Sequence, residues 1–197
     1  MGNVDLFYRF NADVLSVKRE GNRIVLDVRD HRPIGFTVAV ASHGDAIEAL
    51  SGDGATLSSL DGMAAAAGDP AAASRAIRHY LERFAFGRLL AWQLADGEGP
   101  LGTVAAFAAR YQPRWGEPPA GDQQLCRFAY VRRADGEAVL ESGNVRSRVH
   151  LNGRGLSMLA ALLAAPAPAP PASFAAGLWQ LGFLETCAAV EPEARRC

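Results

Sequence analysis

Side chains that could carry out acid–base, nucleophilic or metal chemistry are scattered along this sequence of 197 residues. The four histidines are His31, His43, His79 and His150. They share no metal-ligand spacing, and no glycine-rich loop follows a strand pattern and opens a helix. The three cysteines form neither a metal motif nor an even disulfide set. We therefore expect no catalytic residue and no metal site in this chain.

Binding through shape and charge is the chemistry that the segment 70–86 could perform. Asp69-Pro70 predicts a helix start, and Gly87 predicts its end. Apolar residues recur at spacings of four and three and predict a buried stripe. Away from that stripe lie Arg75, Arg78, His79, Glu82 and Arg83. This outward face could read DNA, dock a peptide, or form a solvated surface that is partly paired through Glu82.

A strand just upstream offers a place for a peptide to pair. Phe36, Val38 and Val40 alternate with smaller neighbours and predict a third strand over 36–41, at the edge of a three-stranded sheet. An edge strand leaves N–H and C=O groups free, so an extended peptide can pair with it and rest against the adjacent helix. A partner domain covering that edge is the alternative.

The segment 127–142, RFAYVRRADGEAVLES, predicts a β-hairpin around Asp135-Gly136, and the chain contains this pattern twice. Moved back by 114 positions, it lies over VLSVKREGNRIVLD, where Gly21-Asn22 makes the turn. The matching continues through a helix start, with His43 on Asn152, and ends with Gly87 on Gly182. Since the order is kept throughout, we infer a duplicated strand-then-helix unit.

The expected fold class is α+β, with two tandem winged helix-turn-helix units, each a three-stranded sheet plus helices. The first would contain helices over 43–50, 56–67 and 70–86 and a trailing hairpin over 89–107. The second would contain helices over 155–164 and 173–184 and lack the middle helix, because PAPAPP stands in its place. The expected domains are 1–112, a linker 113–122, a trimmed repeat 123–190 and a tail 191–197.

Composition and charge favour a folded protein of the cytoplasm. The chain is 49% hydrophobic and 21% charged, and its N-terminus does not resemble a signal peptide. The uncharged run 155–184 is interrupted by prolines, which favours two short buried helices over a membrane span. The net charge of −1 and the single lysine, Lys18, disfavour nucleic acid as a partner.

Three segments resemble one protein family. RFAYVRRADGEAVLES, then RVHLNGRGLSMLAALL, then GLWQLGFLE, resemble the N-terminal region of SagB-type azoline dehydrogenases, which act in the biosynthesis of thiazole- and oxazole-modified peptides. LLAWQLADGEGPLGTVAAF is similar to their trailing hairpin. The resemblance covers nearly the whole chain.

In that family such regions are similar to PqqD-like domains, winged helices that capture the leader of a precursor peptide. The resemblance implies that the third strand and third helix bind the peptide, here through Phe36, Val38, Val40, Arg75, Arg78, His79 and Arg83. It also implies that FMN is held by a following oxidase domain or subunit, with no cofactor on this chain. The implied partners are the leader, that oxidase and the cyclodehydratase of the same pathway.

The leading hypothesis is therefore a non-catalytic recognition or docking module, in which the first copy binds the peptide because it keeps all three helices. One rival is a winged-helix transcription regulator that binds DNA. Another is a structural dimerisation segment.

Overall fold

The computed structural model describes residues 4–66, 68–108, 111–119, 123–164 and 172–186. The fold is α+β, as expected, with five helices in the described residues and mostly antiparallel strands. The chain divides into two compact units, Leu6–Gln93 and Leu94–Cys197 with Met1–Asp5. This boundary lies earlier than residue 112, because the second strand of the trailing hairpin pairs within the C-terminal unit. None of the described helices is long and apolar enough to cross a membrane.

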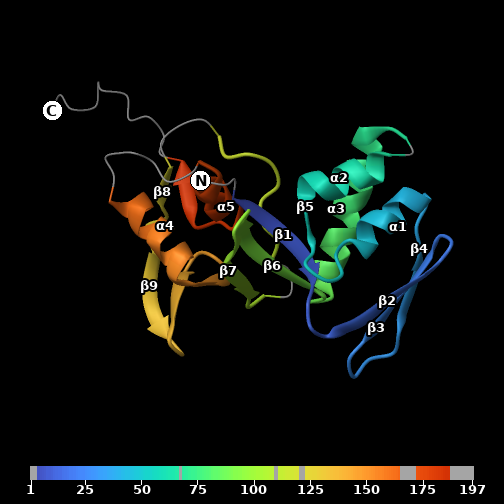
Figure 1. Ribbon diagram of the computed structural model, residues 1–197, viewed down its shortest axis with the longest axis horizontal. Helices are drawn as coiled ribbons and strands as arrows, with labels where there is room; N and C mark the ends of the chain where they lie inside the picture. The colour runs from blue at the N-terminus through green and yellow to red at the C-terminus, as the bar shows by residue number, and fades with distance from the viewer. Residues whose placement is uncertain (1–3, 67, 109–110, 120–122, 165–171, 187–197) are drawn as a thin grey trace. The chain divides into compact units, whose positions relative to one another are not determined.

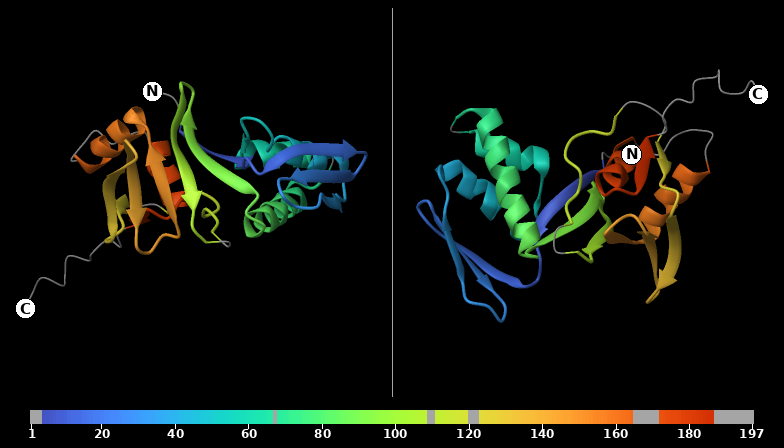
Figure 2. Two further views of the ribbon diagram at one scale, coloured as in Figure 1. Left: turned by 90° about the horizontal axis from the view of Figure 1, so that it is seen from below. Right: turned by 180° about the vertical axis from the view of Figure 1, so that it is seen from behind.

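The N-terminal unit contains two sheets and three helices (Figure 1). Its elements are β1 (Asp5–Phe10), β2 (Val14–Glu20), β3 (Arg23–Val28), β4 (Ile34–Thr37), α1 (Ala41–Glu48), β5 (Ala55–Thr56), α2 (Leu57–Ala65), α3 (Pro70–Phe86) and the first half of β6 (Leu90–Asp96). Strand β1 lies between β5 and β6, and β2, β3 and β4 form a separate antiparallel sheet in that order. Helices α1 and α3 lie on one face of this second sheet (Figure 2).

Local sequence signals account for these elements. Gly21 has φ 62°, so the β2–β3 turn uses the left-handed conformation that glycine adopts most readily. The Asp69 side chain caps α3 by accepting from the N–H groups of Ala71 and Ala72, with Pro70 in the first turn. Thr56 caps α2 by accepting from the Ser59 N–H. The helix predicted over 70–86 is thereby confirmed.

The C-terminal unit contains a larger antiparallel sheet, a two-stranded ladder and two helices. Its elements are β7 (Gly99–Ala106), β8 (Gln123–Leu125), β9 (Ala129–Ala134), β10 (Glu137–Ser142), β11 (Ser147–Leu151), α4 (Gly153–Leu163), α5 (Ala172–Gln180) and β12 (Leu184–Thr186). Strands β7, β11, β10 and β9 are neighbours in that order, and β8 pairs with β12. The PAPAPP segment lies outside the described residues.

The two hairpins have the same register, which supports the duplication. Val17 pairs with Leu26 and Lys18 with Val25 in the first, while Val131 pairs with Leu140 and Arg132 with Val139 in the second. Each of these residues is shifted by the same 114 positions. The first hairpin contains one extra residue, since the register of β2 shifts between Val14 and Ser16. We call β1 to β6 the first repeat and β8 to β12 the second repeat.

The hydrogen bonds that end the last helix of each repeat also match. In the first, Leu89 N–H donates to Phe84 O at 2.8 Å, and Asn11 N–H donates to Leu89 O at 2.8 Å. In the second, Phe183 donates to Leu178 O at 2.9 Å, and Cys126 donates to Phe183 O at 2.9 Å. The repeat thus also includes an opening strand and a returning strand that pair with each other.

Several sequence-based bounds and matches were wrong. The third strand ends at Thr37, not Ala41, because Val40 is already the N-cap of α1, which begins at Ala41. Its counterpart in the second repeat is followed directly by Asn152, the N-cap of α4, so Val40 rather than His43 corresponds to Asn152. The last predicted helix ends at Gln180, and Leu184 begins β12. Strands β1, β5, β8 and β12 were not predicted.

The match of Gly87 with Gly182 was also one residue off, and the correction yields a test. The left-handed residue after α3 is Arg88, with φ 57°, whereas its counterpart after α5 is Gly182, with φ 88°.

We expect Arg88→Gly to raise the free energy of unfolding by about 0.5–1 kcal/mol, because glycine relieves the left-handed strain. Gly182→Ala is the matched control, with an expected loss of about 1 kcal/mol. Urea unfolding measures both, and a destabilised Arg88→Gly variant would contradict this assignment.

Candidate functional site

The outer edge of β4 is the main candidate site. In the described sheets β4 pairs with β3 alone. Val38 N–H donates to Asn22 O at 2.8 Å, toward β3. Because antiparallel bonding alternates along a strand, Ile34 and Phe36 also face β3 with their N–H groups, while Gly35 and Thr37 direct theirs outward. These outward groups are the ones that an added strand would bind.

Aromatic rings of β4 and α3 lie beside this edge, and we call the edge and these rings the β4–α3 surface. The Phe36 ring centroid lies 5.8 Å from that of Tyr80 and 5.7 Å from that of Phe84. Phe84 is buried against Phe10, at 5.3 Å, whereas Phe36 and Tyr80 are only half-buried. Ile34 shares the helix-facing side of the sheet with Phe36 and is 42% exposed. The result is an apolar surface beside backbone groups with which no described strand pairs.

His43 of α1 adds a polar group next to the aromatic rings. The residue is buried, and its ring meets Tyr80 edge-on at 6.4 Å. Its Nδ1 atom has no hydrogen-bond partner in the described part of the chain. An unsatisfied buried nitrogen of this kind costs free energy unless a further molecule or group binds it.

Arg19 of β2 fixes the position of α1 relative to the hairpin. Its guanidinium binds Glu48 at 2.9 Å and donates to Ala41 O at 2.8 Å, and its Nε donates to Gly21 O at 2.9 Å. Hydrogen bonds to Asp45 and Glu48 raise the pKa of Arg19 above its ordinary value. The N-terminal end of α1, which follows β4 by three residues, is thereby held against the sheet.

The residues predicted to bind a peptide are distributed over different surfaces. Phe36 lies in the β4–α3 surface, whereas Val38 is buried and Val40 is the N-cap of α1. Arg78 lies on the α2 side of α3, 3.9 Å from Asp61. The three other basic residues of α3 are exposed: Arg75, His79 and Arg83.

Arg83 and His79 lie nearest to the β4–α3 surface. His79 is adjacent to Tyr80, with ring centroids 6.1 Å apart, and Arg83 follows Tyr80 by three positions on the helix. The sequence reasoning missed Ile34, Gly35, Tyr80 and His43. Ile34 could have been found from its period-two spacing to Phe36, but no sequence signal distinguishes the half-buried Tyr80 from a core residue.

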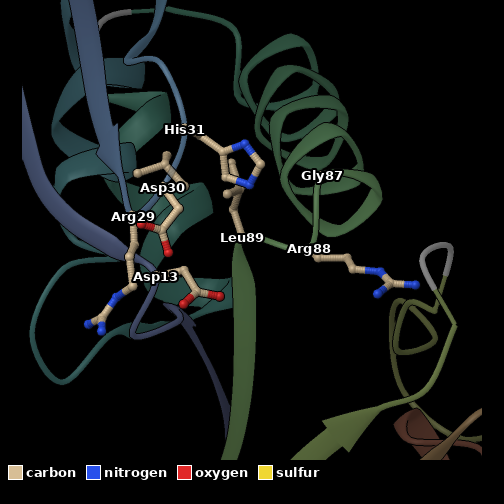
Figure 3. Close-up of a pocket in the computed structure, with 8 residues that line it drawn as sticks. Asp13, Arg29, Asp30, His31, Gly87, Arg88 and Leu89 are labelled. Carbon is tan, nitrogen blue, oxygen red and sulfur yellow. The ribbon is translucent and has the colours of Figure 1, made fainter.

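Each repeat has a hollow at the foot of its hairpin, but the two linings differ. The first has a volume of about 300 Å³ and is lined by Asp13, Val28, Arg29, Asp30, His31, Gly87, Arg88 and Leu89 (Figure 3). The Arg88 side chain points away from Asp13 and Asp30 (Figure 3). The corresponding hollow in the second repeat is lined by Phe128, Tyr130 and their neighbours. No group of three or more His, Cys, Asp or Glu side chains that could hold a metal ion occurs among the described residues.

The outer sheet face of the C-terminal unit contains a satisfied charge network. Glu141 accepts from the Tyr130 hydroxyl at 2.9 Å and from Arg132 at 2.8 and 2.9 Å. The pKa of Glu141 is lowered to about 2, mainly by the hydrogen bonds from Arg132. Because these groups already bind one another, this face is a weaker candidate for a binding site than the β4–α3 surface.

Charge-reversal substitutions distinguish the side of α3 that faces α2 from its exposed side. Arg78→Glu should lower the free energy of unfolding by about 0.5–1 kcal/mol, because it places a second negative charge beside Asp61. Arg83→Glu, on an exposed site, should change it by less than about 0.5 kcal/mol. Urea unfolding at low ionic strength measures both. Equal losses would show that Arg78 is not held on the α2 side.

Comparison with known proteins does not assign a family. No protein-family model matches the chain, and no curated protein matches it. The geometry of the β4–α3 surface and the resemblance of the sequence segments are therefore the grounds for a function.

Proposed function

We propose that this chain binds an extended peptide by adding it as a strand to the outer edge of β4. In this proposal the chain is the leader-recognition or enzyme-docking module of an FMN-dependent azoline oxidase that makes thiazoles and oxazoles in a ribosomal peptide. Catalysis and FMN belong to the associated oxidase domain or subunit, and the complex works in the cytoplasm.

The open edge of β4 is the observation that carries the proposal. Gly35 and Thr37 direct their N–H groups away from β3, and no described strand pairs with them. Main-chain hydrogen bonds supply affinity in strand addition, and pockets or surfaces for alternate side chains supply specificity. Ile34 and the half-buried rings of Phe36 and Tyr80 would provide that apolar contact.

The order of elements also supports a winged-helix recognition module. A three-stranded antiparallel sheet, β2–β3–β4, is followed by three helices, the order that the resemblance implies for PqqD-like domains. Arg75, His79 and Arg83 have exposed side chains on α3 and could bind acidic side chains of the peptide. Val38 is replaced as a contact residue by Ile34, because Val38 is buried and directs its N–H to Asn22.

The test is a proline substitution at an outward-facing position. Peptides of about twelve residues, selected from a phage-displayed random library on the full chain, are titrated by fluorescence polarisation. Gly35→Pro should weaken binding at least about tenfold, because proline removes an outward N–H donor. Gly35→Ala is the matched control, since an added Cβ meets only the Arg23 and Val25 side chains, at 3.7 Å or more.

Unchanged affinity in a folded Gly35→Pro variant would reject strand addition at β4. The leader assignment is tested separately, with the N-terminal segment of a precursor peptide encoded beside this chain as the labelled probe. Binding of the selected peptides without binding of that segment would leave strand addition in place and remove the leader role.

A further inference from the structure

The second repeat shows how an added strand lies on the edge that is open in the first. Strand β11 is the counterpart of β4, because Val149 and Leu151 pair with Leu140 and Ala138 as Ile34 and Phe36 pair with Leu26 and Ile24. The outer edge of β11 is not open. Strand β7 pairs with it in antiparallel orientation, with Val104 opposite Val149 and Gly102 opposite Leu151.

Burial of the corresponding side chains follows the presence of this strand. Val149, which pairs with β7, is 0% exposed, whereas its counterpart Ile34 is 42% exposed. Leu151 is buried, while its counterpart Phe36 is half-buried. The helix residue Phe174 is fully buried, and its counterpart in α3, Tyr80, is half-buried. The first repeat therefore has a surface like that of the second, and no strand of the described part of the chain covers it.

We propose that β7 covers the edge of β11 in the same way as a bound peptide would cover the edge of β4, and that the sequence of β7 therefore indicates which peptides β4 binds. We call the peptide strand added to β4 the guest. The guest on β4 runs antiparallel, with glycine opposite Phe36 and a branched apolar residue opposite Ile34. This inference rests on the proposed strand addition and specifies its ligand. It also assigns peptide binding to the first repeat alone, because the edge of β11 is occupied.

The small residue is required by the close approach of the two strands. A Cβ atom on Gly102 would lie 2.8 Å from the His150 carbonyl oxygen and 3.1 Å from the Leu151 and Val149 side chains. The nearest of these atoms is the backbone carbonyl oxygen of His150, and Gly35 is the counterpart of His150 on β4, so the same backbone group is present there. Any residue with a Cβ atom at this position would push the guest away from β4.

The branched residue is required by the apolar contact one pair further along the strand. Val104 is 7% exposed and lies opposite Val149 on the helix-facing side of the sheet. The guest residue opposite Ile34 would bury apolar surface in the same way. Between these two positions, Thr103 is exposed on the other face, so the guest residue opposite Gly35 is free to vary.

The correspondence ends where the repeats diverge. Residues 38–40 separate β4 from α1, whereas Asn152 alone separates β11 from α4. Asn152 N–H donates to Leu101 O of β7 at 3.0 Å, and Asn152 is also the N-cap of α4. In the first repeat Val40 is the N-cap of α1 but lies beyond the end of β4, so no single residue there matches Asn152 in both respects. The requirement therefore covers only the positions opposite Ile34 and Phe36.

A peptide with the sequence of β7 tests this inference on the full chain. Fluorescein-labelled GPLGTVAA, residues 99–106, is titrated by fluorescence polarisation, together with versions carrying Gly102→Leu, Val104→Gly or Thr103→Ser. The parent peptide should bind saturably. Gly102→Leu should weaken binding at least about tenfold and Val104→Gly about threefold to tenfold, while Thr103→Ser should stay within about twofold.

The Gly35→Pro and Gly35→Ala chains locate the binding. Loss of parent binding in Gly35→Pro alone places the peptide on β4 and supports the inference together with the substitution pattern. If library-selected peptides bind β4 but the parent does not bind, or the Gly102→Leu peptide binds equally well, the inferred register is rejected and strand addition stands. If neither peptide set depends on Gly35, both proposals fail. A concentration-dependent mass in sedimentation, with no peptide binding, would assign the edge to a second copy of this chain.

Discussion

Unpaired backbone groups at a sheet edge are the constraint on which the structure depends. Every buried N–H and C=O group needs a partner, and a strand at an edge leaves half of its groups without one in the sheet. The second repeat meets this need with β7, which the chain itself supplies. In the first repeat no strand of the described residues pairs with the outer edge of β4, and Ile34 and half-buried rings lie beside it. The two copies thus differ in occupancy of one edge.

Small changes in chain length account for the differences between the copies at the hairpin and at the start of the first helix. The extra residue in β2, at the register shift between Val14 and Ser16, leaves the rest of the hairpin unaltered. Residues 38–40 move α1 away from the end of β4, and Val40 caps α1 without a side-chain hydrogen bond, whereas Asn152 caps α4 with one. These changes lie at strand ends and turns, where insertion disturbs few packed side chains.

Sequence reasoning found the features whose signals are local. The Asp135-Gly136 turn and the Asp69 cap act within a few residues, so the hairpins and α3 were predicted correctly. The contacts of the polar residues on α3 were harder to predict. Apolar periodicity locates the buried stripe of the helix, but it does not show which neighbouring element each polar side chain contacts. Arg78 therefore appeared beside the strand, although it lies near Asp61 of α2. Single strands such as β12 depend on distant partners and gave no local signal.

The composition of the edge strands gives an independent reason to expect a ligand at β4. Natural sheets protect exposed edges with charged side chains, especially against pairing with other chains. Strand β2 carries Lys18 and Arg19, and β9 carries Arg132 and Arg133, and both are edge strands. Strand β4 has the sequence IGFT, without any charge. An apolar, uncharged edge favours association with other chains, so a protein that keeps one gains from a specific occupant that covers it.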